Sequence, residues 1–269
     1  MSSARVQAPL LTAVYGRVQA LLLAAVLRDP THLSKKFAAR LIALYDRGGN
    51  YQCPCCMSMC RTFRPYWMPF KPNVMCPKCG SHERHRLLWL YLKNRTDFFS
   101  APLQVLHFAP EPCFREHFVG APNLLYVSAD IDRSRAMVQA DITRLPFLTG
   151  CFDVILCLHV LEHVSNDTEA MLELFRILKP GGWAIVLVPI DKTRTTTFED
   201  PHITSADERE SAFGQYDHVR LYGLDYRSKL ANAGFSVTID EYVKELPADV
   251  LDRYGLDFEE DIFVLNKPA

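Results

Sequence analysis

The chain has 269 residues, 49% of them hydrophobic, and a formal net charge of −1. This is the composition of an ordinary soluble protein with room for one large α/β domain and an appendage. A transmembrane helix is excluded, because Arg17 and Gln19 interrupt the apolar residues 10–27 and leave no run of roughly 20 apolar residues.

Charge is spread unevenly along the chain. Residues 1–49 carry seven Lys or Arg against two Asp or Glu, residues 50–95 carry eight against one, and residues 190–269 carry nine against seventeen. A basic front and an acidic tail indicate either an anionic partner near the front or attraction between the two parts of the chain. The sequence is compatible with both.

Residues 1–49 predict a helical segment. Apolar residues at helical spacing cover two stretches within residues 5–46, and Asp29-Pro30 separates them. We expect this pair to pack on the main domain or on a second subunit, where it would mediate oligomerisation. Two rivals are a helix on a membrane surface and an organellar transit peptide, because residues 1–28 contain no acidic residue.

Two Cys-x-x-Cys pairs predict a zinc site. Nineteen residues separate the pair Cys53 and Cys56 from the pair Cys76 and Cys79, a spacing typical of four-thiolate Zn²⁺ sites. Four protein ligands leave no open coordination position, so we expect this zinc to be structural.

The other cysteines bear on the compartment and on the ligand set. The chain has nine cysteines, an odd number, and no secretory signal peptide, which favours a reducing compartment and a cytoplasmic protein. Cys55 and Cys60 lie close enough in the sequence to replace Cys53 or Cys56 as ligands.

Residues 50–97 therefore predict a zinc-ribbon-like segment followed by a linker helix. Its basic and aromatic residues are interleaved: Arg61, Phe63, Arg64, Tyr66, Trp67, Phe70, Lys71, His82, Arg84, His85 and Arg86. Single-stranded nucleic acid is bound by such surfaces. The same residues would also help a small ribbon to pack, and its cations would offset the charge of about −2 on a four-thiolate zinc.

Residues 98–269 predict an α/β domain. Short apolar runs predict strands at residues 103–108, 124–128, 154–158, 183–188, 235–240 and 262–265. Between the third and fourth runs lies a helix that ends at the sequence Lys-Pro-Gly-Gly, residues 179–182. Two buried strands joined by a helix belong to a parallel sheet, and ligands bind at the carboxyl ends of such strands. The polar residues His159, Glu162 and His163 follow the third strand there.

The stretch FDVILCLHVLEHV, followed by LKPGGW, resembles the strand-4 and strand-5 signatures of class I S-adenosylmethionine-dependent methyltransferases, in particular their type 11 branch. The resemblance covers roughly residues 103–267, and the zinc-ribbon-like segment is similar to one fused to some members. It implies a Rossmann-like class I methyltransferase fold with a mostly parallel seven-stranded sheet, and an enzyme that uses S-adenosylmethionine.

The resemblance also implies a cofactor site after the first strand. The family has a glycine-rich loop there, where this chain has His107-Phe-Ala109-Pro110-Glu111-Pro and no glycine. Ala109 and Pro110 would form the tight turn. Glu111 would meet the ammonium group of the cofactor or act as an acid at the start of the following helix.

Further cofactor contacts are implied after the next strands. Asp130 would hold the ribose hydroxyls, with Asp132 as the alternative, and Asp141 and Ile142 would meet the adenine. His159, after the fourth family strand, completes the implied cofactor-binding set.

His159-Val-Leu-Glu162-His163 matches the H-x-x-E-H pattern of one class of zinc proteases, but that pattern must lie on a helix. Here it follows a buried strand, which excludes a protease. Glu162 and His163 would either shape the substrate face or bind a divalent ion, because acid-x-x-Glu-His at this place resembles the metal site of small-RNA 2′-O-methyltransferases. His159 in place of the first acid favours a metal softer than magnesium.

The segment after the fifth family strand covers the substrate in this family, which the resemblance transfers to residues 213–222. Gln215, Asp217, His218, Arg220 and Tyr222 make this segment rich in hydrogen-bonding groups. Asp217 and His218 predict an oriented general base, because histidine titrates near working pH. His163 is the second candidate for the base.

We therefore expect an S-adenosylmethionine-dependent methyltransferase that acts on a small or anionic acceptor. One alternative is an RNA or rRNA methyltransferase that grips RNA with its basic ribbon. Another is a non-catalytic binding protein that lost its cofactor together with the glycine loop. A dinucleotide-dependent dehydrogenase is excluded by the lack of any G-x-G-x-x-G sequence.

Overall fold

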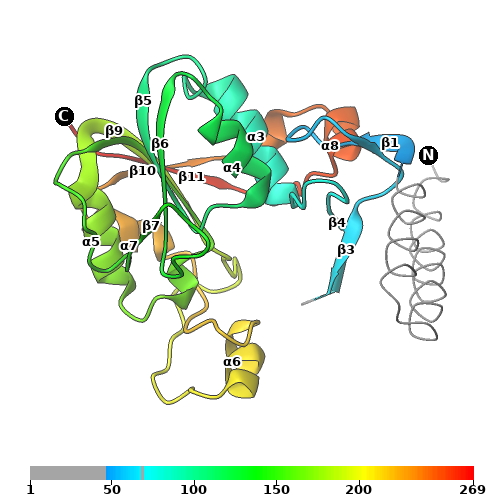
Figure 1. Ribbon diagram of the computed structural model, residues 1–269. Coiled ribbons are helices and arrows are strands. Elements are labelled where there is room, and N and C mark those ends of the chain that lie inside the picture. Colours follow the sequence, from blue (N-terminus) through cyan, green and yellow to red (C-terminus); the bar gives the residue numbers. More distant parts are fainter. Residues whose placement is uncertain (1–46, 68–69) are drawn as a thin grey trace.

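The structure, a computed structural model, describes residues 47–67 and 70–269, so the helical pair predicted within residues 5–46 lies outside it (Figure 1). Two small hairpins and a helix precede a seven-stranded sheet. None of the helices within the described ranges is long and apolar enough to cross a membrane.

The seven-stranded sheet has the order β10-β11-β9-β8-β5-β6-β7. Five strands run parallel to one another: β5 (Leu103–Phe108), β6 (Leu124–Asp130), β7 (Val138–Gln139), β8 (Phe152–Leu158) and β9 (Leu178–Leu187). The strands β10 (Ser236–Asp240) and β11 (Ile262–Asn266) pair antiparallel, and β11 is antiparallel to β9. This confirms the predicted Rossmann-like, mostly parallel sheet.

Helices cover both faces of the sheet. Figure 1 shows α3 (Glu83–Arg95) and α4 (Pro112–Val119) on one side and α5 (Asp167–Ile177) and α7 (Tyr226–Asn232) on the other. Two further helices, α6 (Ala206–Phe213) and α8 (Ala248–Tyr254), lie outside these layers. Central strands covered on both faces must be apolar throughout, and residues 154–157 of β8 are all fully buried.

The Lys-Pro-Gly-Gly sequence at residues 179–182 was expected to end the helix, but it lies within the following strand. The helix α5 already ends at Ile177, and β9 begins at Leu178. Phe152 pairs with Leu178 and Val154 with Trp183, so residues 179–182 form a bulge in β9. A Cβ atom at Gly182 would lie 2.8 Å from the backbone oxygen of Asp153, which explains the glycine at this close approach.

The ribbon consists of two hairpins, β1 (Arg47–Gln52) with β2 (Met59–Cys60) and β3 (Arg64–Trp67) with β4 (Phe70–Met75). Arg86 of α3, which is fully buried, joins it to the acidic tail. Its guanidinium donates to the carbonyls of Val74 and Ser81 in the ribbon and of Tyr254 and Gly255 at the end of α8.

The basic front and the acidic tail of the chain attract each other. Lys71 of β4 lies 2.6 Å from Asp257 of the tail and 2.6 Å from Glu83. Three other members of the basic and aromatic set, Phe63, His85 and Arg86, are buried. Phe63, His85 and Arg86 are therefore not available to a nucleic acid, whereas Lys71 is paired but half exposed.

Candidate functional site

The strand order of the sheet reverses at β5. The chain passes from β5 to β6 and β7 on one side and returns to β8 and β9 on the other. Ligands of open α/β sheets bind at such a switch point, outside the carboxyl ends of the two adjacent strands. The residues that directly follow β5 and β8, Ala109 (φ 45°) and His159 (φ 54°), both have left-handed backbone conformations. Such strain costs about 1–3 kcal/mol per non-glycine residue and concentrates at functional sites.

A cavity of about 700 Å³, here called the switch-point cavity, lies at this edge of the sheet. The loops after β5, β6, β7 and β8 line it, together with Asp217 from the segment after β9. Seven of the predicted site residues lie in its lining: Ala109, Asp130, Asp141, Ile142, His159, His163 and Asp217. Ala109 lines the cavity in the left-handed conformation that glycine adopts most readily.

Three predicted cofactor residues lie outside this lining, namely His107, Pro110 and Glu111. His107 is fully buried, with its ring between the hydroxyl of Tyr126 at 3.1 Å and the carboxylate of Glu111 at 2.7 Å. Glu111 is the N-cap residue of α4, but its side chain makes no capping hydrogen bond. Its carboxylate is therefore used to hold His107 in place.

Glu162 is the least exposed acidic group of the site, with 1% of its surface accessible. Neither carboxylate oxygen has a hydrogen-bond partner within the described residues, although Nδ1 of His159 lies 3.2 Å from Oε1. Burial raises the pKa of Glu162 to about 6. The same effect holds the pKa of His159 well below its ordinary value, so this histidine is neutral.

The buried charge of Glu162 makes stability depend on pH. Because the folded-state pKa of about 6 exceeds the ordinary value of 4.5, the folded protein binds more protons in this window, and stability falls as pH rises through it. We expect Glu162→Gln to stabilise the protein by about 2 kcal/mol at pH 8 and to have little effect at pH 4. Denaturant titrations at both pH values, without added metal ions, measure this. Equal effects at the two pH values would contradict it.

His163 and His218 lie edge to face, with ring centroids 4.7 Å apart. Nδ1 of His163 faces the backbone carbonyl of Asp217 at 3.3 Å and lies 3.4 Å from its carboxylate, whereas Nδ1 of His218 faces the carbonyl of Phe213 at 3.3 Å. Asp217 therefore orients His163, although the sequence suggests the pair Asp217 and His218. His218 is buried behind His163 and lies outside the cavity lining.

Glu162, His163 and His218 bring one ligand atom each within 4.8 Å of one another. An orphaned buried carboxylate beside two imidazoles is a donor set that fits a divalent transition metal. In both histidines Nδ1 faces an oxygen atom, which leaves Nε2 for a ligand, as in the outer shells of metal sites. The sequence indicated Glu162 and His163 for such a site, but only the fold brings His218 to them.

Arg220 holds the loop that carries Glu162 and His163. It is buried and donates to the carbonyls of Leu161, Val164 and Ser165 in that loop. The sequence placed Arg220 among substrate-covering groups, whereas its contacts are with the loop itself.

We expect Arg220→Ala to destabilise the protein by about 3–5 kcal/mol. The buried carboxylate of Asp167, 3.6 Å away, would lose one of its partners, and three carbonyls would lose their hydrogen-bond donor. Denaturant unfolding measures the loss. Arg194→Ala is the matched control, since Arg194 is an exposed arginine paired with Asp191 and should cost less than about 1 kcal/mol. Equal losses in the two variants would contradict this role.

The four predicted zinc ligands Cys53, Cys56, Cys76 and Cys79 form the second cluster. Their sulfur atoms lie within 4.8 Å of one another, with 3.5 Å between Cys53 and Cys79 and 3.8 Å between Cys56 and Cys76. Bonds of about 2.3 Å to a tetrahedral zinc require sulfurs about 3.8 Å apart, so the set fits this metal.

The two cysteine pairs sit in equivalent turns. The amide of Cys53 donates to the carbonyl of Ser58, and that of Cys76 donates to the carbonyl of Ser81. Each turn contains one residue of positive φ directly after its second cysteine, Met57 in the first and Gly80 in the second. Cys55 points away, with its sulfur 3.9 Å from the carbonyl of His85, and is outside the cluster.

Sequence reasoning missed other residues of the switch-point cavity. Arg135, Thr143, Ser165 and Asn166 also line it. They lie in the same loops as the predicted residues but belong to no motif, so only their positions next to Asp130, Asp141 and His163 could have indicated them.

Residues 120–186 match the family model described as a methyltransferase domain. Within these residues the chain is similar to the methyltransferases of that family. An uncharacterized methyltransferase of Mycolicibacterium gilvum is 36% identical over 75 residues, which are 26% of this chain and 29% of the relative. The ubiquinone/menaquinone biosynthesis C-methyltransferase UbiE of Coxiella burnetii is 37% identical over 57 residues, 21% of this chain and 23% of the relative.

The methyltransferase match is local, since the chain spans less than a third of the length of these relatives. Among solved structures, a SAM dependent methyltransferase from Archaeoglobus fulgidus is 15% identical with a TM-score of 0.45, covering 69% of this chain and 95% of that one. The matched segment includes all of β6, β7 and β8, and thus three of the strands whose following loops line the switch-point cavity.

Proposed function

We propose that the protein transfers a methyl group from S-adenosylmethionine bound in the switch-point cavity to an acceptor. The observation that carries this proposal is the cavity itself, at the switch point of a methyltransferase-family sheet and lined by Asp130 and Asp141. A binding protein that had lost its cofactor with the glycine loop would have no need of the strained Ala109, and the strain therefore favours the enzyme.

The cofactor contacts follow from the loops around the cavity. Oδ1 of Asp130 accepts from the amide of Asp132, which fixes the carboxylate, and Oδ2 is left to accept the ribose hydroxyls. The Oδ1 atom of Asp141 is likewise held by Thr143, which leaves the other oxygen for the adenine amino group beside Ile142. Ala109 and His159 flank the end of the cavity where the methionine part would lie.

The cofactor supplies an electrophilic methyl group on a sulfonium, and the protein aligns the acceptor in line with the carbon–sulfur bond. His163 lines the cavity and is oriented by Asp217, so it would take the proton that the acceptor loses. His218, the first candidate from the sequence, would instead support the ring of His163 from behind.

We expect His163→Ala to lower turnover by about 10²–10⁴-fold and to leave the affinity for S-adenosylhomocysteine nearly unchanged. Turnover with labelled S-adenosylmethionine and binding of S-adenosylhomocysteine are measured on the same preparations. His202→Ala is the control, because His202 is an exposed histidine outside the lining of the switch-point cavity. Turnover within a factor of two of the wild type in both variants would show that His163 is not the base.

A divalent ion bound beside the cavity is the second candidate role for His163. Glu162, His163 and His218 would hold it, and the ion would supply charge stabilisation for an acceptor oxygen. Metal analysis separates the two proposals, since a second metal ion per chain beyond zinc, lost in Glu162→Gln, supports the ion and contradicts a free His163 base.

We further propose that Cys53, Cys56, Cys76 and Cys79 hold one structural Zn²⁺. The hydroxyls of Ser58 and Ser81 lie 3.1–3.3 Å from these sulfurs and would donate to the thiolates. A small-molecule acceptor is favoured over RNA, because Phe63, His85 and Arg86 are buried and Lys71 is paired with the tail.

A further inference from the structure

A second cavity, of about 570 Å³, lies between the ribbon and the acidic tail and is here called the ribbon–tail pocket. Its walls come from Lys71 of β4, the start of α3 at residues 82–84, the loop after β9 at residues 188–192 and the tail at residues 257–261. His159 lines this pocket and the switch-point cavity alike. A molecule in the ribbon–tail pocket would therefore lie next to the cofactor site.

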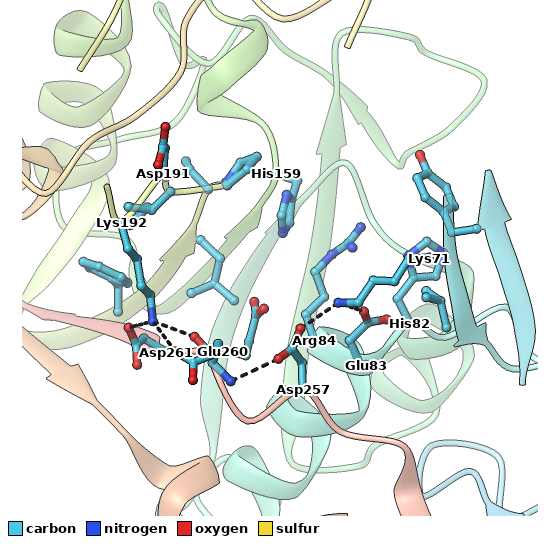
Figure 2. A pocket seen from close by; sticks show the side chains of 18 residues that line it. Lys71, His82, Glu83, Arg84, His159, Asp191, Lys192, Asp257, Glu260 and Asp261 are labelled. Carbon is cyan, nitrogen blue, oxygen red and sulfur yellow. Dashed lines mark hydrogen bonds and ion pairs between the residues drawn. The ribbon is translucent and has the colours of Figure 1, made fainter. Parts of the chain in front are cut away.

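Two ion-pair groups form opposite sides of the ribbon–tail pocket. Lys71 pairs with Glu83 and Asp257, and Lys192 pairs with Asp261 at 2.8 Å. Figure 2 shows these groups with Arg84 and Glu260 between them. Neither Arg84 nor Glu260 has a side-chain hydrogen bond or ion pair within the part of the chain that the structure describes.

Buried polar atoms without partners concentrate in this pocket. Oε2 of Glu83 and Oδ1 of Asp261 can only accept hydrogen bonds, and Nε of Arg84 can only donate. The side chain of Glu83 is 9% exposed, so water does not freely reach its second oxygen. Buried polar groups in native proteins are hydrogen-bonded to protein, ligand or ordered water, so these three atoms fit a ligand that both donates and accepts.

The ligand chemistry follows from this requirement. An ammonium ion only donates, so it would leave Arg84 unpaired, and a carboxylate or phosphate only accepts, so it would leave Glu83 and Asp261 unpaired. Anions would also meet six carboxylates against three Lys or Arg in the lining. The same negative surroundings would keep an amine protonated, and a protonated amine has no lone pair to accept a methyl group. A hydroxyl group donates and accepts at once.

We propose that the ribbon–tail pocket is the acceptor site and that it takes a neutral polyhydroxylated small molecule, one of whose hydroxyl oxygens is methylated. This inference rests on the proposed methyltransferase function. The hydroxyl oxygen forms the new bond to the methyl carbon as the carbon–sulfur bond breaks. Sulfur keeps the bonding electron pair and becomes a neutral thioether. The reacting hydroxyl reaches past His159 into the switch-point cavity, where His163 takes its proton and passes it to water.

The charge state of the acceptor is the first test. A small-molecule extract of the source cells is separated on anion and cation exchangers into anionic, cationic and neutral fractions. Each fraction is incubated with the zinc-loaded full chain and methyl-labelled S-adenosylmethionine, and half of each is first treated with periodate, which cleaves vicinal diols. We expect label in the neutral fraction only, with at least a tenfold loss after periodate.

Label transferred in the anionic or cationic fraction, or resistant to periodate, overturns the inference. Label in no fraction overturns it too, provided that the protein binds S-adenosylhomocysteine. If S-adenosylhomocysteine does not bind, the proposed function itself fails, and the two failures are therefore distinguishable.

The pocket is tested by substitution with the neutral fraction as substrate. We expect Arg84→Gln and Asp261→Asn each to raise the concentration of this fraction needed for half-maximal rate by at least tenfold, with unchanged affinity for S-adenosylhomocysteine. Arg133→Gln is the control, because Arg133 is exposed and lines neither cavity. Zinc content and the midpoint of unfolding verify that each variant is folded. An unchanged requirement in both folded variants would overturn the assignment.

Discussion

Replacing Cys76 and Cys79 together with serine is expected to abolish stoichiometric zinc and to unfold the ribbon. The free energy of zinc binding in small four-ligand sites is about 10–16 kcal/mol at pH 7, a loss that the hydrogen bonds of Arg86 and the ion pairs of Lys71 to the ribbon would not offset. Arg86 would then lose its partners in the ribbon, so the loss should extend to the contact with α8. Metal analysis and limited proteolysis measure both effects.

The matched control is Cys55→Ala. Cys55 lies in the same turn as Cys53 and Cys56, but its sulfur points to the carbonyl of His85. We expect this variant to keep one zinc per chain and an intact ribbon. Stoichiometric zinc in the double serine variant, or its loss in Cys55→Ala, would show that the ligand set differs from the one proposed.

Replacing Asp130 with alanine is expected to weaken the binding of S-adenosylhomocysteine by roughly 100-fold. The carboxylate would lose hydrogen bonds from two ribose hydroxyls, and bonds to a charged acceptor contribute about 1.5–3 kcal/mol each. Stability should change little, because the one hydrogen bond that the Asp130 side chain accepts within the described residues comes from the amide of Asp132. Isothermal titration calorimetry measures the affinity.

Asp132→Ala is the control for this prediction. Asp132 is the alternative that the sequence left open, and the structure places it at the surface, where Oδ1 accepts from Ser134. Its affinity should stay within a factor of two of the wild type. Weaker binding in Asp132→Ala than in Asp130→Ala would show that Asp132, and not Asp130, contacts the ribose.

The fold was largely predictable because its signals are local. Apolar runs and a helical stretch between residues 154 and 188 specify two buried strands and the helix between them, and the structure has them as β8, α5 and β9. The bulge at residues 179–182 was not predictable, because it depends on the close approach of Gly182 to the neighbouring strand. The four cysteines of the cluster could be predicted from their spacing alone.

The site was less predictable because much of it forms between distant segments. The partner of Asp217 is His163, 54 residues earlier, although the sequence favoured the adjacent His218. Arg84, Glu260 and Asp261 belong to no motif, and they meet only because the ribbon packs on the tail. The uneven charge of the chain was the one sequence signal for that packing, and the ion pair between Lys71 and Asp257 explains part of it.

The central claim is that the switch-point cavity binds S-adenosylmethionine despite the glycine-free loop at Ala109. Thermal unfolding of zinc-loaded protein with and without S-adenosylhomocysteine tests it most directly. Ligand at 100 times its dissociation constant should add about 2.7 kcal/mol to the free energy of unfolding, which raises the midpoint by several degrees. No shift at millimolar ligand would contradict the account and would favour a methyltransferase fold that binds something else.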